Sequence, residues 1–409
     1  MPETHNIPKG FTPHPFAYHE IVTLDIHTLT NQGHGLGRLD NWVVIVPFAL
    51  PGESVKARIY RNHPNYSDAD LVAVLNPSPH RTKPACPLFG DCGGCQYQNL
   101  AYEQQLLFKQ QQVHELLQHM AKIDHPVEPV IPSPAQYGYR SKITPHFQKP
   151  KKNNISAIGF LKVGRRQQIV DVPNCPIAAP PLNNTLTELR DDIFNHASRY
   201  KKGATLLLRL SGNDVVTDPK ELAREQVGEI TFEFIAGEFF QNNPSILPAF
   251  TRHVAAEASQ NNTQFLIDAY CGAGLFALTA AKRFQQVKGV EISELSIQWA
   301  RHNAQQNHIE NAKFLEGRAE AIFDNITFDP TQTAVVIDPP RKGCDEPFLD
   351  QLLNFGPSRI VYVSCNPATQ MRDLKSLAAD GHYRLTRVQP FDLFPQTKHL
   401  ECVITLEKN

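Results

Sequence analysis

From about residue 260 to its end, the chain alternates short apolar segments with amphipathic ones, and no other feature constrains the fold as strongly. The runs QFLIDAY, VKGVEI, TAVVIDPP and RIVYVSC have the composition of buried strands, while LFALTAAKRF and ELSIQWARHNAQQN have helical spacing. Two further strand-like segments, RLTRVQPFD and ECVITLEK, close the chain. This rhythm predicts an open, mostly parallel, doubly wound α/β sheet with helices on both faces, over residues 236–409.

The chain ahead of this segment predicts two further domains, because 409 residues are too many for one ordinary core. Residues 14–78 contain about five short strand-like runs separated by glycine-rich turns, which favours a small β-barrel of the OB type. Residues 79–235 mix strand-like pieces with many prolines and predict a central α+β domain. Within it, residues 100–121 have the apolar spacing of a helix.

Composition and charge limit the protein class only coarsely. A hydrophobic share of 41% and a charged share of 20% are typical of a soluble globular protein. The net charge of −1 means that any basic surface for nucleic acid is local, and basic residues do gather at 149–152, 162–166 and 199–202. We find no long uncharged apolar span and no secretory signal, and we therefore expect a cytoplasmic protein without membrane segments.

A glycine-rich turn follows the first strand of the predicted α/β domain. Gly272 and Gly274 stand between this strand and the next helix, where glycine lets the backbone approach a ligand. Glu291 ends the second strand and can accept hydrogen bonds from ribose hydroxyls. Together with Ala277 the turn also fits the dinucleotide fingerprint, so it does not separate a nicotinamide cofactor from S-adenosylmethionine. A turn that only packs helix against strand is the other interpretation.

Two polar residues stand at the ends of later strands, on the edge where open α/β sheets bind their ligands. Asp338 ends one strand and is followed by two prolines, which stiffen the loop. Cys365 ends another, ahead of a predicted helix that begins near Pro367 and would lower the pKa of a thiol. The position favours a nucleophile over a buried, inert cysteine. Glu401, at the start of the last strand, fits a solvated edge if taken alone.

Four cysteines outside the predicted α/β domain suggest a metal site. Cys86, Cys92 and Cys95 are separated by five and then two residues, and Cys175 lies far downstream in a similar Cys-Pro pair. Four thiolates suffice for a [4Fe–4S] cluster or for tetrahedral zinc. The spacing lacks the paired Cys-x2-Cys knuckles that structural zinc usually uses. Four candidate ligands also favour a closed, structural site over one with an open iron.

The ordered motifs CPLFGDCGGCQYQ, FFQNN, DPPRKG, SCNPAT and HLECV resemble those of the RNA uracil-5-methyltransferase family. The similarity covers nearly the whole chain and is strongest to the branch with an N-terminal TRAM domain and an iron–sulfur cluster, which methylates 23S ribosomal RNA. The segment GHGLGRLDNWVVIVPFALPGESVKARI is similar to TRAM, an RNA-binding barrel. The resemblance therefore implies S-adenosylmethionine as cofactor, RNA as partner and, we expect, a monomer.

The resemblance also implies roles for individual residues. Cys365 matches the nucleophile and Glu401 the general base. Four residues match S-adenosylmethionine contacts: Gln241, Tyr270, Glu291 and Asp338. Four residues match ligands of a [4Fe–4S] cluster: Cys86, Cys92, Cys95 and Cys175. The family packs the helix at 100–121 with the catalytic domain, so that domain is expected to be discontinuous.

The sequence alone leaves other functions open. One is methylation of carbon 5 of a uridine in transfer RNA, and three others belong to different classes. A nicotinamide-dependent oxidoreductase would use the glycine turn but would leave Cys365 and Glu401 without a role. An iron–sulfur redox enzyme would need its cofactor or an electron path near the cluster. A non-catalytic RNA-binding protein would use the barrel and the basic clusters but would not need polar residues at the strand ends.

Overall fold

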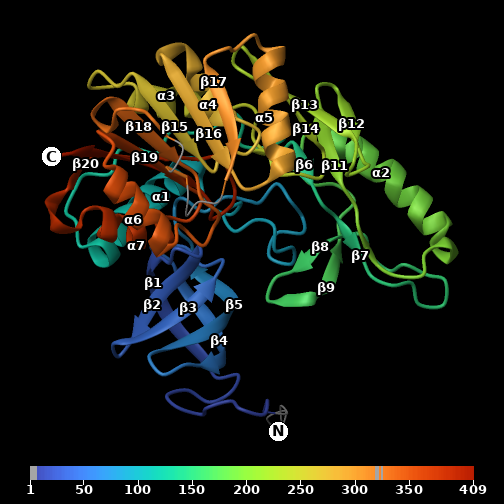
Figure 1. Cartoon of the computed structure of the whole chain (residues 1–409). Coiled ribbons are helices and arrows are strands. Elements are labelled where there is room, and N and C mark those ends of the chain that lie inside the picture. The colour runs from blue at the N-terminus through green and yellow to red at the C-terminus, as the bar shows by residue number, and fades with distance from the viewer. Residues whose placement is uncertain (1–6, 318–321, 324–325) are drawn as a thin grey trace, which may run out of the picture. The chain divides into compact units, whose positions relative to one another are not determined.

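The computed structural model describes residues 7–317, 322–323 and 326–409 and divides into two compact units (Figure 1). The first consists of the chain up to Phe108 together with Gln396–Lys398. The second consists of Lys109–Pro395 and His399–Asn409. None of the helices in the described parts of the chain combines the length and the apolar character needed to span a membrane.

A closed five-stranded barrel forms the core of the first unit, as the alternating sequence predicts. Its strands follow the order β1-β2-β3-β5-β4: β1 (Ile21–Leu29), β2 (His34–Leu39), β3 (Trp42–Pro47), β5 (Tyr66–Asn76) and β4 (Ser54–Asn62). Alternate residues of β1 point inward, which is the period-two pattern of a strand with one buried face. Gly37 is needed for close packing, since a Cβ there would lie 2.3 Å from the Asp25 carbonyl oxygen.

The cysteine-containing segment that follows the barrel is anchored to it by a buried carboxylate. Glu53 is only 1% exposed, and its Oε2 accepts hydrogen bonds from the Leu50 amide at 2.8 Å and from Arg81 Nη2 at 2.7 Å. Its Oε1 accepts from the Ser78 amide at 3.2 Å. Because every oxygen of this buried group is bonded, the segment from 78 onward has a defined path. Helix α1 (Tyr102–Leu116) then begins in the first unit and ends in the second.

The second unit is built on a seven-stranded sheet, which confirms the predicted doubly wound α/β fold. Its order is β17-β16-β15-β18-β19-β21-β20, and only the last two strands run antiparallel to their neighbours. The strands are β15 (Phe265–Ala269), β16 (Gln286–Glu291), β17 (Ala312–Glu316), β18 (Thr333–Ile337), β19 (Arg359–Ser364), β20 (Tyr383–Phe391) and β21 (Glu401–Lys408). The helices are α3 (Leu247–Ala258), α4 (Leu275–Ala280), α5 (Glu294–Gln306), α6 (Glu346–Phe355) and α7 (Pro367–Leu377).

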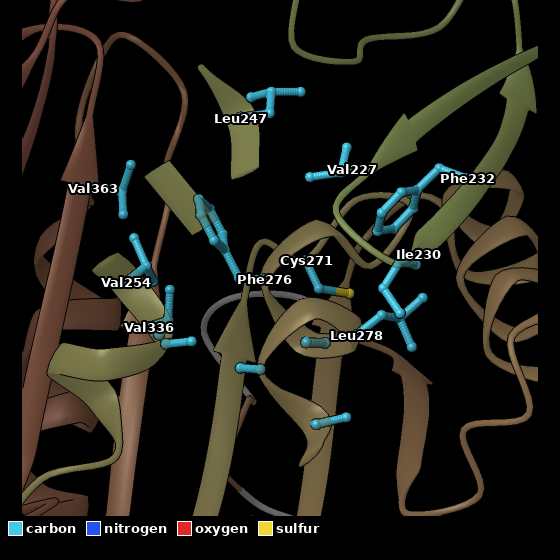
Figure 2. Close-up of a cluster of buried hydrophobic side chains, with 14 of the residues drawn as sticks. Val227, Ile230, Phe232, Leu247, Val254, Cys271, Phe276, Leu278, Val336 and Val363 are labelled. Carbon is cyan, nitrogen blue, oxygen red and sulfur yellow. The ribbon is translucent and has the colours of Figure 1, made fainter. Parts of the chain in front are cut away.

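Each face of this sheet carries its own core. Helices α3, α4 and α5 cover one face, and Figure 2 shows Val254 and Phe276 from this layer together with Val336 of β18. Helices α6 and α7 cover the other, together with the end of α1 and the π-helical turn η1 (Leu117–Ala121). Consecutive strand residues alternate between the two cores, so Val335 belongs to the second and Val336 to the first.

Small sheets and one helix make up the rest of the second unit. They comprise β6 (Lys142–Ile143), β7 (His146–Phe147), β8 (Gly159–Lys162), β9 (Arg165–Asp171), α2 (Pro180–Asn195), β10 (Ala204–Thr205), β11 (Leu208–Ser211), β12 (Asp214–Val216), β13 (Leu222–Val227) and β14 (Ile230–Ile235). Their sheet orders are β10-β7-β8-β9, β12-β11-β6 and β13-β14. The predicted central α+β content is therefore present, and β14 leads directly into the segment that carries Gln241.

Candidate active site

Three of the predicted site residues stand in one row at the carboxyl ends of neighbouring parallel strands. In the sheet register, Ala269 of β15 is opposite Val290 of β16 and Ile337 of β18. Tyr270 therefore lies between Glu291 on one side and Asp338 on the other. Ligands bind at this edge of an open α/β sheet, because the loops that follow the strands diverge there.

The glycine turn beside this row is held by Glu291. Its Oε2 accepts a hydrogen bond from the Gly272 amide at 3.2 Å, and its Oε1 accepts from the Ser293 amide at 3.0 Å. Gly272 and Gly274 have φ values of 52° and 93°, which favour glycine. Tyr270 has φ 63°, a conformation that costs energy for an aromatic residue and is concentrated at functional sites.

Asp268 is a candidate site residue that the sequence analysis does not single out. It is fully buried in β15, and its Oδ2 accepts a hydrogen bond from the Ala277 amide in α4 at 2.7 Å. Its Oδ1 has no hydrogen-bond partner among the described residues. Burial, with further contributions from Asp338 and Glu291, raises its pKa to about 8. A single acid inside the apolar run FLIDA was the available signal.

Antiparallel pairing brings Cys365 and Glu401 together. Ser364 of β19 is opposite Cys402 of β21, so the residue after Ser364 meets the residue before Cys402. Cys365 is half-buried, whereas Glu401 is only 3% exposed. Glu401 Oε2 has no hydrogen-bond partner within the described ranges. The interpretation of Glu401 as a solvated strand edge is therefore wrong, because β21 lies inside the sheet with a strand on each side.

The surroundings of this group favour the protonated forms of its members. Burial, and after it the neighbouring Glu401 carboxylate, raises the pKa of the Cys365 thiol to about 11. Burial raises the pKa of Asp338 to about 7. Burial, and after it Asp338, raises the pKa of Glu401 well above its usual range. The positive charge of Arg341 opposes the rise in the pKa of both Cys365 and Glu401. Buried acids with raised pKa values suit a cationic ligand, because its positive charge favours their ionised forms.

Gln241 lies outside this row, in the segment that follows β14. Its side chain is buried at 5% exposure. The two aromatic residues before it differ sharply. Phe240 is buried and stacks on Phe234 with ring centroids 4.4 Å apart, which is ordinary core packing. Phe239 is 75% exposed and is the one of the pair that is available to a ligand.

The four cysteines that predict a cluster share the partial exposure of Cys365. Cys86, Cys92, Cys95 and Cys175 are half-buried, whereas Cys271, Cys344 and Cys402 are buried. The Cys86 amide donates to Gln98 Oε1 and the Cys175 amide to Asn183 Oδ1, at 2.9 and 2.8 Å. Within the described residues, no group of three or more His, Cys, Asp or Glu side chains is arranged to hold a metal ion. The cluster therefore stays a prediction.

The sheet order, the glycine turn and the row of polar residues are those of a Rossmann-like α/β domain with a cofactor site at the carboxyl ends of its strands. Comparisons with known proteins narrow this class. Residues 212–409 match the family described as tRNA (Uracil-5-)-methyltransferase, and residues 19–72 match the TRAM domain.

Individual relatives extend these matches to nearly the full length. The chain is 43% identical to the tRNA (uracil(54)-C(5))-methyltransferase of Schizosaccharomyces pombe, over 96% of this chain and 79% of that protein. It is 35% identical to the enzyme of the same name from Saccharomyces cerevisiae, over 98% and 76%. The crystal structure of Pyrococcus abyssi tRNA (uracil-54, C5)-methyltransferase with S-adenosyl-L-homocysteine matches with a TM-score of 0.72 at 26% identity, covering 94% of this chain and 100% of that one. The chain belongs to the RNA uracil-5-methyltransferase family, as its motifs predict.

Proposed function

We propose that this enzyme transfers a methyl group from S-adenosylmethionine to carbon 5 of a uridine in transfer RNA, through a covalent adduct between Cys365 and the uracil ring. The juxtaposition of the Cys365 thiol and the Glu401 carboxylate, beside the row of Tyr270, Glu291 and Asp338, carries this proposal. The sequence motifs favour 23S ribosomal RNA, but the relatives named above are named for uracil 54 of tRNA and support the alternative.

The chemistry needs a nucleophile and a base on the same pyrimidine. S-adenosylmethionine supplies an electrophilic methyl group on its sulfonium. The Cys365 thiolate adds to carbon 6 of uracil, which places electron density on carbon 5 for attack on that methyl. The Glu401 carboxylate then removes the proton from carbon 5, and the bond between carbon 6 and sulfur breaks to return the thiolate. Covalent catalysis thus divides one difficult step into several easier ones.

The row of residues at the strand ends is suited to hold the cofactor. We infer that Glu291, fixed by two backbone amides, accepts hydrogen bonds from the ribose hydroxyls. Tyr270 lies next to Glu291 in the row and Asp338 follows it, and the ionised carboxylate of Asp338 favours a sulfonium over a neutral ligand. Gln241 completes the proposed contacts from the segment after β14. Asp268 supports them indirectly by holding the start of α4.

The target base must leave its own stack to reach Cys365. Phe239, exposed beside the buried Phe240, offers an aromatic face to such a base. We propose that the barrel within residues 14–78 and the basic clusters of residues 79–235 bind the RNA. The basic clusters contain four exposed lysines: Lys149, Lys151, Lys201 and Lys202.

The central experiment compares Cys365→Ala with Cys402→Ala. Both remove one thiol, but Cys402 is buried within β21 and faces the second core. We expect Cys365→Ala to abolish methyl transfer to unmodified tRNA transcripts and Cys402→Ala to retain it, measured by incorporation of labelled methyl groups. Turnover by Cys365→Ala at a rate close to wild type would remove the covalent mechanism.

The RNA class is tested separately. Unmodified tRNA and 23S ribosomal RNA transcripts are offered to the wild-type enzyme in parallel, and 5-methyluridine is mapped by mass spectrometry. We expect modification of the tRNA alone. Modification of the ribosomal transcript alone would contradict the tRNA proposal and support 23S ribosomal RNA as the substrate. Mapping of total RNA from cells that lack the protein gives the same answer in vivo.

We further propose that Cys86, Cys92, Cys95 and Cys175 are ligands of a closed [4Fe–4S] cluster. The close spacing of Cys86, Cys92 and Cys95 along the chain and the resemblance to the iron–sulfur branch of the family support this donor set, and thiolates are the usual ligands of such clusters. Protein purified without oxygen should show the broad visible absorbance of the cluster, and Cys92→Ser should lose it and bind RNA more weakly while keeping S-adenosylmethionine binding. An unchanged spectrum in Cys92→Ser would remove this ligand assignment.

A further inference from the structure

The loop that follows Asp338 is held by the helix that follows Cys365. The side chains of Asn366 and Thr369, at the start of α7, both donate hydrogen bonds to the Arg341 carbonyl oxygen, at 3.0 and 3.2 Å. One turn later, Arg372 Nη2 donates to the carbonyl oxygens of Lys342 and Cys344, at 3.0 and 3.1 Å. Consecutive turns of one helix thus bind the backbone of one loop.

Asp373 completes this attachment from inside the protein. It is 1% exposed, and its Oδ2 accepts from the Cys344 amide at 2.8 Å and from the Tyr362 hydroxyl of β19 at 2.7 Å. Gly343 has φ 79°, and a Cβ there would lie 2.5 Å from Asp373 Oδ2. The loop therefore packs so tightly on α7 that only glycine fits at this position. A buried, fully bonded carboxylate of this kind gives the loop one conformation.

This attachment fixes the backbone of Arg341 beside the start of α7. Asn366 directly follows Cys365, so its hydrogen bond to the Arg341 carbonyl oxygen places the loop beside the thiol. The positive charge of Arg341 there opposes the rise in the pKa values of Cys365 and Glu401. The other charged groups that face the thiol are Glu401 from β21 and Asp338 from the end of β18, and both are acidic. Burial and the two acids favour the protonated thiol. Among the described residues, Arg341 is the cation that opposes them and favours the thiolate.

We propose that Arg341 is a further catalytic residue, which stabilises the Cys365 thiolate, and that Asp373 and Thr369 are positioning residues that hold Arg341 in place through α7. The proposal rests on the proposed role of Cys365. The thiol proton leaves to solvent once, because elimination of the product returns the sulfur as the thiolate. The side chain of Arg341 is exposed, so it can approach the sulfur without a large desolvation cost of its own.

The experiment follows the ionisation of Cys365 directly and needs no RNA. The full-length protein is alkylated with iodoacetamide at a series of pH values, and the modification of the Cys365 peptide is measured by mass spectrometry. We expect Arg341→Gln to move the midpoint of Cys365 alkylation upward by about one pH unit, so that alkylation below the midpoint is about tenfold slower. Lys342→Gln removes the same charge one residue away and should leave the profile unchanged. An unchanged profile in Arg341→Gln would overturn the proposal.

The positioning residues are tested by a milder variant. Thr369→Val keeps the shape of the side chain and removes the hydroxyl that donates to the Arg341 carbonyl. We expect a smaller upward shift of the same profile, about threefold in rate, with unchanged circular dichroism. Arg341→Lys should restore part of the shift seen in Arg341→Gln because it keeps the charge. If the alkylation profile of Arg341→Lys equalled that of Arg341→Gln, and the profile of Thr369→Val equalled that of the wild type, the positioning role would be contradicted.

These outcomes are separate from those of the proposed function. If Cys365→Ala retained methyl transfer, Cys365 would not be the nucleophile, whatever its alkylation profile. If Cys365→Ala were inactive while Arg341→Gln kept the wild-type profile, the covalent mechanism would stand and Arg341 would have no part in activating the thiol.

Discussion

The two ends of strands β19 and β21 carry charged groups that behave in opposite ways. At one end, Arg359 pairs with Glu407 in the register, and its guanidinium bonds both Glu407 and Glu257. Although burial raises the pKa of Glu257, hydrogen bonds from Thr405 and Arg387 bring it below its usual value. At the other end, burial raises the pKa values of Asp338 and Glu401.

This difference separates charges that support the fold from charges that serve the reaction. The acids near Arg359 are matched by cations at hydrogen-bond distance, so their burial is compensated. Near Cys365, Arg341 opposes the raised pKa of Glu401, but Glu401 Oε2 lacks any hydrogen-bond partner among the described residues. Groups left uncompensated in this way are typical of sites that await a ligand.

The largest effect is expected from Glu401→Gln. Loss of the general base should lower turnover by about 100- to 10,000-fold, and the methylated RNA should stay bonded to Cys365 because carbon 5 keeps its proton. The adduct is measured as a slow band on a denaturing gel. Glu407→Gln, the same substitution at the opposite end of β21, should form no such adduct and should retain turnover. Near-normal product release by Glu401→Gln would contradict the assigned role.

Arg359→Met tests the other end of the strands. It leaves the buried Glu257 and the partly exposed Glu407 without their shared partner, and we expect the free energy of unfolding to fall by about 3 kcal/mol. Chemical denaturation at neutral pH measures this change. Glu401→Gln in the same assay should be neutral or slightly stabilising, since it removes an unpaired buried acid. Equal losses in both variants would remove the distinction between the two ends.

The pH dependence of cofactor binding sharpens the comparison further. Asp338, with a pKa raised to about 7, is mostly protonated in the free enzyme below that pH. The cationic sulfonium favours the ionised carboxylate, so affinity for S-adenosylmethionine should fall as pH drops below about 7, by up to tenfold per pH unit. Titration calorimetry measures this slope. Asp338→Asn should flatten it, and S-adenosylhomocysteine, which lacks the sulfonium, should show a weaker slope.

The smallest effect is expected at Asp268. Because its pKa is raised to about 8, it is already neutral at pH 7, and asparagine keeps an oxygen to accept from the Ala277 amide. Asp268→Asn should therefore change the free energy of unfolding by less than about 1 kcal/mol. Glu257→Gln, at the opposite end, should cost more because Glu257 is ionised. A large loss in Asp268→Asn would mean that this acid is charged in the folded protein.

Local patterns were enough to predict the strands, the glycine turn and the placement of Cys365 at a strand exit. These features depend on neighbouring residues, since the strand period and the glycine φ values are properties of short segments. The roles proposed for Gln241 and Tyr270 came only from the family motifs. The sequence does not distinguish Phe239 from Phe240, because adjacent aromatic residues look alike until packing exposes one and buries the other.

The sequence by itself thus determines the types of the elements, their order and the edge of the sheet that carries the polar residues. The sequence does not predict contacts between distant segments. Only the folded chain shows that Glu401 meets Cys365, that α7 binds the Arg341 loop and that Asp268 Oδ1 has no hydrogen-bond partner among the described residues. The physical reason is that a charge changes its behaviour with its surroundings, and those surroundings are assembled from strands and helices far apart along the chain.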